Sequence, residues 1–145
     1  MEWHVFHPAD LQHLMLQKSQ EHFAPLLTDP EYGETLCAAG PAITVVDDGE
    51  VLACGGLVHL WEGRAQVWSL ISRNAGRRFV RIFRIMQDFL AEHPVTRVEA
   101  TVDAGFTQGL RMIEMLGFSH EGLMKSYQNG KDAHLYALVR GRRMH

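Results

Sequence analysis

Residues 67–83 read Val67-Trp68-Ser69-Leu70-Ile71-Ser72-Arg73-Asn74-Ala75-Gly76-Arg77-Arg78-Phe79-Val80-Arg81-Ile82-Phe83. The pattern is typical of an apolar strand, a short basic loop with one glycine and an amphipathic helix. A helix N-terminus offers free backbone N–H groups and a partial positive charge, to which Arg73, Arg77 and Arg78 add full charges. This junction of strand and helix therefore predicts a binding site for an anion, with phosphate as the natural ligand.

The composition indicates one compact domain over residues 1–145. Of the 145 residues, 46% are hydrophobic and 21% are charged, and a chain of this kind buries a real core without metal or disulfide support. The net charge of −3 argues against a nucleic-acid partner, because such binders usually carry a broad basic surface. The basic character is local instead, in the loop before the long helix.

The sequence gives no indication of export or of membrane insertion. No apolar run reaches the ~20 residues needed to span a bilayer, and the start of the chain lacks a basic stretch followed by an apolar segment. Cys37 and Cys54 match no metal-ligand spacing and are expected to be reduced, buried thiols. We therefore expect a cytoplasmic protein with no membrane partner.

The N-terminal half predicts helices followed by an antiparallel meander. A short strand comes first, then a helix that opens at His7-Pro8, and then a second helix with Asp29 as its N-cap and Pro30 in its first turn. Turn residues such as Asp47-Asp48-Gly49-Glu50 separate the β-rich runs that follow. The expected strands are residues 3–6, 42–46, 51–60 and 65–72.

The C-terminal half predicts a long helix, a strand, a shorter helix and a closing hairpin. The hairpin turns at Asn129-Gly130, a preferred pair for a type I′ turn. The basic tail from Arg140 onward is expected to be solvated. The expected elements are a helix over 76–93, a strand over 96–102, a helix that ends at Gly117, and strands over 119–128 and 131–139. The whole order is β-α-α-β-β-β-α-β-α-β-β.

Taken together, the meander, the basic glycine loop, the ending Leu116-Gly117-Phe118 and the closing hairpin resemble the GNAT superfamily of N-acetyltransferases. The resemblance implies an α+β fold with a central, mixed and mostly antiparallel sheet of about seven strands flanked by helices. It further implies that two middle strands splay apart and that acetyl-CoA lies in the cleft as co-substrate, with its pyrophosphate on the loop. The cofactor-binding residues that it implies are Leu70, Ile71, Arg73, Asn74, Ala75, Gly76, Arg77 and Arg78.

Within the superfamily, the chain looks most like small phage and prophage GNAT-like proteins, including internal virion or morphogenesis proteins of short-tailed phages. This narrower resemblance rests on Gln66-Val67-Trp68, the arginine-rich helix start and the Gly-Phe ending. It implies a location in the host cytoplasm or the virion, and a phage structural protein as a partner.

Three positions depart from the family pattern. Arg78 stands where relatives carry a small residue in the pyrophosphate loop. Ile113 stands where many active relatives carry a tyrosine that protonates the CoA thiolate, and Phe106 stands where an asparagine often contacts the cofactor arm. The resemblance therefore implies that catalysis by this chain needs another proton donor, or that the thiolate leaves with the aid of water.

Two side chains are candidates for the catalytic proton transfers. Glu99, with Asp103 just beyond it, is the best-placed carboxylate for a general base, and the alternative is an ion pair with Arg97 or with a basic residue on a neighbouring strand. Tyr127 is the candidate proton donor to sulfur, and the alternative is an amphipathic packing residue between strands.

Other prominent side chains are expected to have structural roles. The nine histidines show no spacing typical of metal ligands, so no metal is expected. Trp68 is expected to fill the core between the sheet and the long helix, together with Phe79, Phe83 and Phe89.

Two classes of function remain open from the sequence. The first is an acetyl-CoA-dependent N-acetyltransferase that transfers the acetyl group to a primary amine by direct attack, with either a small molecule or a protein as acceptor. The alternative is a catalytically degenerate GNAT-fold phage protein that acts in virion assembly or protein binding, with a structural protein or a second copy of the chain as its partner.

Overall fold

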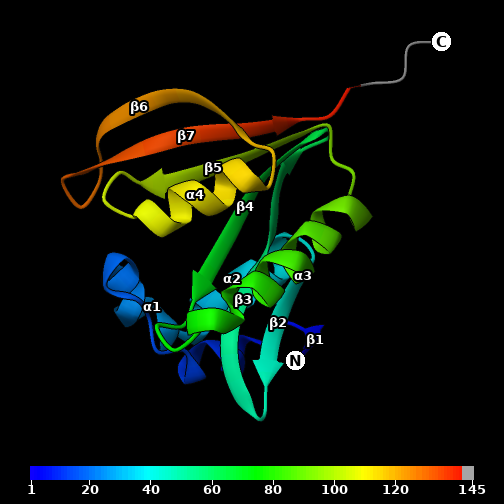
Figure 1. Cartoon of the computed structure of the whole chain (residues 1–145), viewed down its shortest axis with the longest axis vertical. Helices are drawn as coiled ribbons and strands as arrows, with labels where there is room; N and C mark the ends of the chain where they lie inside the picture. Colours follow the sequence, from blue (N-terminus) through cyan, green and yellow to red (C-terminus); the bar gives the residue numbers. More distant parts are fainter. Residues whose placement is uncertain (142–145) are drawn as a thin grey trace.

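Seven strands form a single mixed sheet in the order β1-β2-β3-β4-β5-β7-β6 (Figure 1). This is a computed structural model, and it describes residues 1–141 apart from the side chain of Ser19. All neighbouring strands are antiparallel except β4 and β5, which are parallel. The predicted α+β fold is confirmed. The strands are β1 Glu2–Val5, β2 Ala42–Asp47, β3 Glu50–Trp61, β4 Arg64–Ile71, β5 Arg97–Asp103, β6 Ser119–Gln128 and β7 Lys131–Val139.

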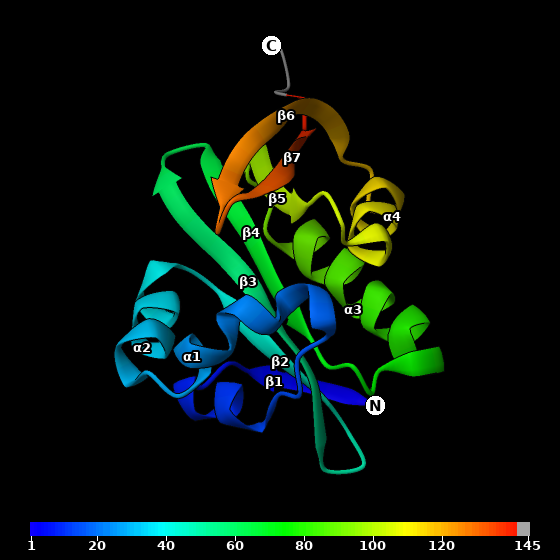
Figure 2. The same ribbon diagram turned by 90° about the vertical axis from the view of Figure 1, so that its left-hand side faces the viewer.

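Helices cover both faces of the sheet, with α1 and α2 on one side and α3 and α4 on the other (Figure 2). The segment expected as a first α-helix is a 3₁₀ helix, and a second 3₁₀ helix and the short α1 were not expected from the sequence. Predictions for the later helices are confirmed to within a few residues. The helices are η1 Pro8–His13, η2 Lys18–Phe23, α1 Ala24–Leu27, α2 Pro30–Ala39, η3 Gly76–Arg78, α3 Phe79–Glu92 and α4 Thr107–Met115.

Local sequence signals explain the hairpins and the start of α2. Asn129 and Gly130 have φ values of 51° and 73° between β6 and β7, the left-handed geometry that a type I′ turn requires at both central positions. Asp48, with φ of 49°, does the same in the β2–β3 turn. The Asp29 carboxylate accepts a hydrogen bond from the Glu31 N–H (3.0 Å) and so caps α2 as predicted.

The core is divided between the two faces of the sheet. Trp68 packs edge-on against Phe6, with ring centroids 5.4 Å apart, in the cluster under the N-terminal segments. The prediction that Trp68 packs under the long helix is therefore wrong, because alternate residues of β4 face opposite sides. Phe79, Phe83 and Phe89 do lie in the clusters on the α3 side.

The two thiols have different environments. Cys54 is fully buried, as expected, whereas Cys37 is exposed, so the prediction of burial is wrong for Cys37. Both are free thiols. Burial raises the pKa of Cys54 to about 12, which keeps this thiol protonated and unreactive.

Arg140 binds the C-terminal end of α3 and is not a solvated tail residue. Its guanidinium donates to the carbonyl oxygens of Leu90 (2.6 Å), His93 (2.9 Å) and Val95 (3.0 Å). Leu90 and His93 lie at the C-terminal end of α3, where the partial negative charge of the helix favours a cation, and Val95 lies in the loop that follows. The rest of the tail, residues 142–145, lies outside the described residues. Among residues 1–141, no helix is long and apolar enough to cross a membrane.

The pairing of β4 with β5 positions the functional cleft. The two strands share only the pairs Arg64–Arg97, Ala65–Val98 and Gln66–Glu99. Beyond Gln66 they diverge, as Figure 1 shows. The splay expected between two middle strands is therefore present, and it leaves one edge of β4 without a neighbouring strand over residues 67–71.

Candidate active site

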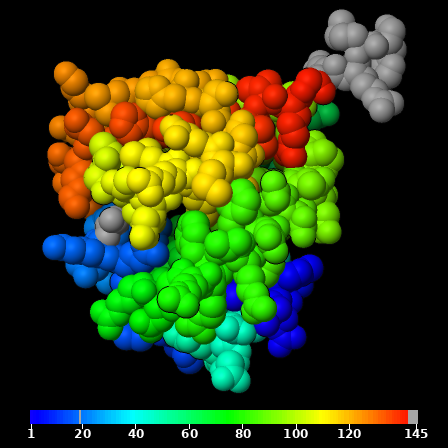
Figure 3. All heavy atoms as spheres, in the orientation of Figure 1, coloured from blue at the N-terminus to red at the C-terminus, as the bar shows by residue number. Residues whose placement is uncertain are grey.

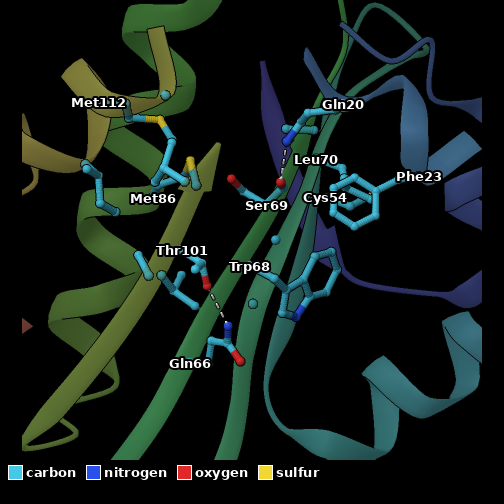
Figure 4. Close-up of a pocket in the computed structure, with 18 of the residues that line it drawn as sticks. Gln20, Phe23, Cys54, Gln66, Trp68, Ser69, Leu70, Met86, Thr101 and Met112 are labelled. Atoms are coloured by element: carbon cyan, nitrogen blue, oxygen red, sulfur yellow. Dashed lines mark hydrogen bonds between the residues drawn. The ribbon is translucent and has the colours of Figure 1, made fainter. Parts of the chain in front are cut away.

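A cavity of ≈ 680 Å³ lies where β4 and β5 diverge. From outside, α3 and α4 lie over this region, with the N-terminal segments beside them (Figure 3). Figure 4 shows the labelled side chains reaching the cavity from both strands and from η2 and α3. The β4 wall is formed by residues 66–70 and the β5 wall by residues 100–103.

The open edge of β4 carries backbone groups that face the cleft. The Ser72 N–H donates to the Leu52 carbonyl oxygen of β3 (2.8 Å). Since successive residues of a strand direct their N–H and C=O groups to alternate edges, the backbone groups of Ser69 and Ile71 point away from β3, toward the gap. Such groups are strong hydrogen-bonding partners that a buried site must satisfy.

Gln20 of η2 satisfies two of these groups. Its Nε2 donates to the Ser69 carbonyl oxygen (3.0 Å), and its Oε1 accepts from the Ile71 N–H (3.1 Å). Gln20 is only 7% exposed and also lines the cavity. Gln20 was not predicted as a site residue, because nothing in residues 18–23 links it to a strand about 50 residues away.

Two polar side chains join the strands at the point of divergence. Gln66 Nε2 of β4 donates to Thr101 Oγ1 of β5 (3.0 Å; Figure 4). Nearby, the indole Nε1 of Trp68 is buried, and it has no hydrogen-bond partner among the described residues.

Glu99 is held by two arginines just outside the cavity. Arg64 donates to both of its carboxylate oxygens (2.9 and 3.0 Å), and Arg97 Nε donates to Oε2 (2.7 Å). The Arg64 hydrogen bonds, opposed by burial, hold the pKa of Glu99 below its ordinary value, whereas a general base at neutral pH needs a raised pKa. The ion-pair interpretation of Glu99 is therefore confirmed, and its geometry gives no support to a role as base.

Tyr127 of β6 and Asp103 of β5 both line the cavity. Tyr127 lies within a register irregularity of β6 between Met124 and Gln128, and such bulges redirect side chains. Tyr127 is 51% exposed. Asp103 is the last residue of β5, and its Oδ1 accepts from the Gly105 N–H (2.8 Å). Asp103 is also the only acidic residue of the described chain that lines the cavity.

Arg78 faces the β2–β3 hairpin and not the cleft. It donates to Asp47 Oδ2 (3.2 Å), Glu50 Oε1 (3.0 Å) and the Asn74 carbonyl oxygen (2.8 Å). The hydrogen bonds to Glu50 and Asp47 raise its pKa. The side chain that departs from the family pattern therefore supports the loop and is neutralised by two carboxylates.

Several loop amides are already occupied. The Arg73 N–H donates to the Met15 carbonyl oxygen (2.7 Å), the Asn74 N–H to Ser72 Oγ (3.0 Å) and the Ala75 N–H to the Ser72 carbonyl oxygen (3.1 Å). Ala75 itself is buried.

The amides of Gly76 and Arg77 remain for a ligand, because they have no acceptor within the part of the chain that the structure describes. Gly76 has φ of +50°, and a Cβ there would meet no heavy atom within 4 Å. Arg73 and Arg77 are exposed beside this open space. The predicted anion site is therefore reduced to one turn, with two free amides and two exposed guanidinium groups.

The other two positions that depart from the family pattern, Ile113 and Phe106, form apolar parts of the cavity wall. Ile113 is 4% exposed and Phe106 is 9% exposed, and both line the cavity. The cavity has no lysine or arginine in its described lining, so any positive charge on a ligand there meets only Asp103. Within residues 1–141, no group of three or more metal-ligating side chains occurs.

The chain has the fold of the GNAT N-acetyltransferases. The ribosomal-protein-alanine N-acetyltransferase of Brucella melitensis superimposes with a TM-score of 0.73 over 97% of this chain and 100% of that chain, at 13% identity. A variant of spermidine N-acetyltransferase from Vibrio cholerae gives a TM-score of 0.66 at 16% identity, over 96% of this chain and 95% of that chain.

A third structure, the ribosomal-protein-S5-alanine acetyltransferase of Vibrio fischeri, gives a TM-score of 0.67 at 13% identity, over 94% of this chain and 91% of that chain. No protein-family model matches the chain, and no curated protein matches it significantly. At these identities the comparison defines the fold, whereas function depends on the site. The narrower resemblance to phage proteins stays a prediction.

Proposed function

We propose that the protein is an acetyl-CoA-dependent N-acetyltransferase that acetylates a primary amine by direct attack. The observation that carries the proposal is the divergence of β4 from β5. It leaves an unpaired edge of β4 beside a cavity of ≈ 680 Å³, and the basic turn at Gly76 follows five residues after the end of β4.

The basic turn is the proposed pyrophosphate site. The free amides of Gly76 and Arg77 and the exposed guanidinium groups of Arg73 and Arg77 supply donors and positive charge. Leu70, Ile71, Asn74 and Ala75 contribute through the backbone that they form, and Arg78 contributes by holding the loop against the hairpin. The chemistry that acetyl-CoA supplies is an activated acetyl thioester.

The residues of the cleft have separate roles in this proposal. The amine nitrogen attacks the thioester carbonyl carbon, and the Ser69 N–H at the open edge of β4 stabilises the negative charge that develops on oxygen. The C–S bond then breaks and the sulfur leaves as a thiolate. We assign removal of the amine proton to Asp103 and protonation of the thiolate to Tyr127, two titratable groups that line the cavity.

Replacement of two arginines tests the cofactor site. In Arg73→Ala/Arg77→Ala, we expect the affinity for acetyl-CoA and for CoA to fall by about tenfold or more, because two charge-assisted contacts are lost. Isothermal titration calorimetry measures this. The matched control is Arg81→Ala/Arg84→Ala, which removes two exposed charges further along the helix, where the field of the helix terminus has faded. Equal affinity in both double variants, or no CoA binding by the folded parent at millimolar concentration, would overturn the proposal.

The second candidate function is a non-catalytic role in phage assembly or protein binding. The observation that favours it is the state of the loop, where Arg78 is neutralised and the amides of residues 73–75 are occupied. A stable complex with a purified phage structural protein, unaffected by Arg73→Ala/Arg77→Ala, is the expected result. Acetyl transfer by the parent at ordinary enzymatic rates would contradict it.

A further inference from the structure

The two hydrogen bonds of Gln20 reproduce the pairing of a parallel strand. In a parallel sheet, the residue that faces position i donates its N–H to the carbonyl oxygen of residue i−1 and accepts from the N–H of residue i+1. Around Leu70, these two groups are the Ser69 carbonyl oxygen and the Ile71 N–H. Gln20 contacts both of them, with Nε2 as the donor and Oε1 as the acceptor. The carboxamide thus stands where β5 would have supplied the backbone N–H and C=O of one residue, had it continued alongside β4.

This edge therefore defines a slot of specific chemistry. An extended chain satisfies both groups with the N–H of one secondary amide and the C=O of the next, because the N–H and C=O of a single trans amide point in opposite directions. A hydroxyl, a carboxylate or an apolar group leaves at least one of them unsatisfied, which is costly in a buried site. The slot opens onto the cavity, since Ser69, Leu70 and Gln20 all line it.

The segment that carries Gln20 is attached to β4 at a few points only. Leu16 forms an isolated bridge with Ser72, and the Met15 carbonyl oxygen accepts from the Arg73 N–H (2.7 Å). Within the segment, the Gln20 N–H donates to the Gln17 carbonyl oxygen (2.9 Å). A 3₁₀ helix has poorer hydrogen-bond geometry than an α-helix, so η2 is suited to releasing one side chain while Leu16 stays in place.

We propose that Gln20 is an internal plug of an amide-binding slot on β4, and that an extended ligand with two successive amides displaces it. The inference rests on the proposed function, because the pantetheine arm of acetyl-CoA is an extended chain with two secondary amides. The two incoming amides make the same number of hydrogen bonds that Gln20 gives up, and the released side chain regains its rotamer freedom. The exchange is therefore close to balanced, and the plug lowers the apparent affinity by the fraction of molecules in which the slot is open.

The test measures pantetheine binding, which does not depend on the phosphate site. In Gln20→Ala, the plug is absent, and we expect pantetheine to bind about tenfold more tightly than to the parent. Gln20→Leu keeps the volume and the apolar stem without the carboxamide, so it gives the same gain with the packing of η2 retained. Gln17→Ala is the matched control, because its carboxamide makes no hydrogen bond among the described residues. It leaves the affinity unchanged.

Amide NMR spectra report on the slot directly. On addition of pantetheine to the parent, we expect the Ser69 and Ile71 amide signals to shift and the Gln20 side-chain NH₂ signals to move to the positions of a solvated carboxamide. Equal or weaker pantetheine binding in both Gln20→Ala and Gln20→Leu overturns the plug, as does the absence of pantetheine binding to all of the variants. Tighter pantetheine binding without any acetyl transfer from acetyl-CoA supports the plug and overturns the proposed function.

Discussion

At the scale of single residues, the chemistry of a cleft side chain follows from the partners that surround it. Glu99 and Asp103 lie four positions apart on β5, yet two arginines surround Glu99, whereas Asp103 lines the cavity. The same contrast separates Arg78, which two carboxylates neutralise, from the exposed Arg77. Residue type and spacing alone do not distinguish the members of these pairs.

Replacement of Glu99 tests its structural role. Glu99→Gln keeps the shape and removes the charge that Arg64 and Arg97 share, so we expect the free energy of unfolding to fall by about 1 kcal/mol, with kcat unchanged. Urea denaturation measures the first quantity and steady-state kinetics the second. Glu62→Gln is the control, because Glu62 is exposed in a turn. A large loss of kcat without a loss of stability would establish Glu99 as the base instead.

Replacement of Tyr127 tests the proton donor. Tyr127→Phe removes the hydroxyl and keeps the ring, so we expect kcat to fall by about 10²-fold, with little change in KM, if the thiolate is protonated here. Tyr136→Phe serves as the control, because the Tyr136 hydroxyl binds Glu114 Oε2 (2.8 Å) away from the cavity. An unchanged kcat in Tyr127→Phe would mean that Tyr127 packs between strands and does not donate the proton.

Predictions for single residues were correct where the partners lie on the same strand or on its neighbour, and wrong or absent where the partners are distant in the sequence. An ion pair was the predicted alternative for Glu99, and the neighbouring strand supplies Arg64 as a second partner. Gln20 was not predicted, because its partners lie 49 and 51 residues away. Trp68 was predicted on the wrong face of the sheet, because a strand with apolar residues on both faces gives no period that identifies its helix side.

At the scale of elements, the two ends of α3 differ in the groups that bind their free backbone N–H and C=O groups. Its N-terminal end begins in the basic turn at Gly76, while its C-terminal end is capped by Arg140 from beyond β7. A side chain that follows β7 thus holds the C-terminal end of the helix whose N-terminal end carries the proposed phosphate site.

Replacement of Arg140 tests this cap. Arg140→Ala leaves three carbonyl oxygens without a charged donor, so we expect the free energy of unfolding to fall by about 2 kcal/mol. Arg140→Lys recovers part of the loss, because one ammonium group does not reach all three carbonyls in the fork geometry of a guanidinium. Urea denaturation of both variants measures this. If Arg140→Lys recovers the full free energy of unfolding, the positive charge alone stabilises the helix end and the geometry of the guanidinium does not contribute.

The elements with local signals were the ones that sequence predicted well. The Asn129-Gly130 turn, the Asp29 cap and the 3.6-residue period of α3 each act within a few residues. The segment of η2 and α1 has no such period, and its place beside β4 depends on long-range contacts such as the one between Leu16 and Ser72. The 3₁₀ form of η1 likewise has no distinct signature in the sequence.

At the scale of the whole molecule, ion pairs bridge strands that are distant in the chain. Arg97 on β5 links Glu99 to Glu121 on β6, with Nη2 2.6 Å from Glu121 Oε1. Together with Arg64, this network ties β4, β5 and β6 together at one end of the sheet. The charges lie at the end where the strands are still paired and not where they diverge.

This network predicts a dependence of stability on pH. Hydrogen bonds from Arg64 lower the pKa of Glu99, and hydrogen bonds from Arg97 lower that of Glu121. A lowered carboxylate pKa stabilises the folded state above the ordinary pKa, and this contribution is lost as the pH falls through the folded value. We therefore expect the free energy of unfolding to fall below about pH 4, as measured by urea denaturation. In Arg97→Gln, we expect the free energy of unfolding to fall less steeply with decreasing pH. An equal fall in Arg97→Gln and in the parent would mean that the ion-pair network is not its cause.

Because only three residue pairs join β4 to β5, the sheet consists of two antiparallel parts, β1 to β4 and β5 to β7, that meet over a short contact. A change in the angle between the two parts breaks no hydrogen bond within either antiparallel ladder. A ligand that binds between the two parts therefore restrains both of them, and we expect its binding to slow amide exchange across the whole sheet instead of only near its own contacts.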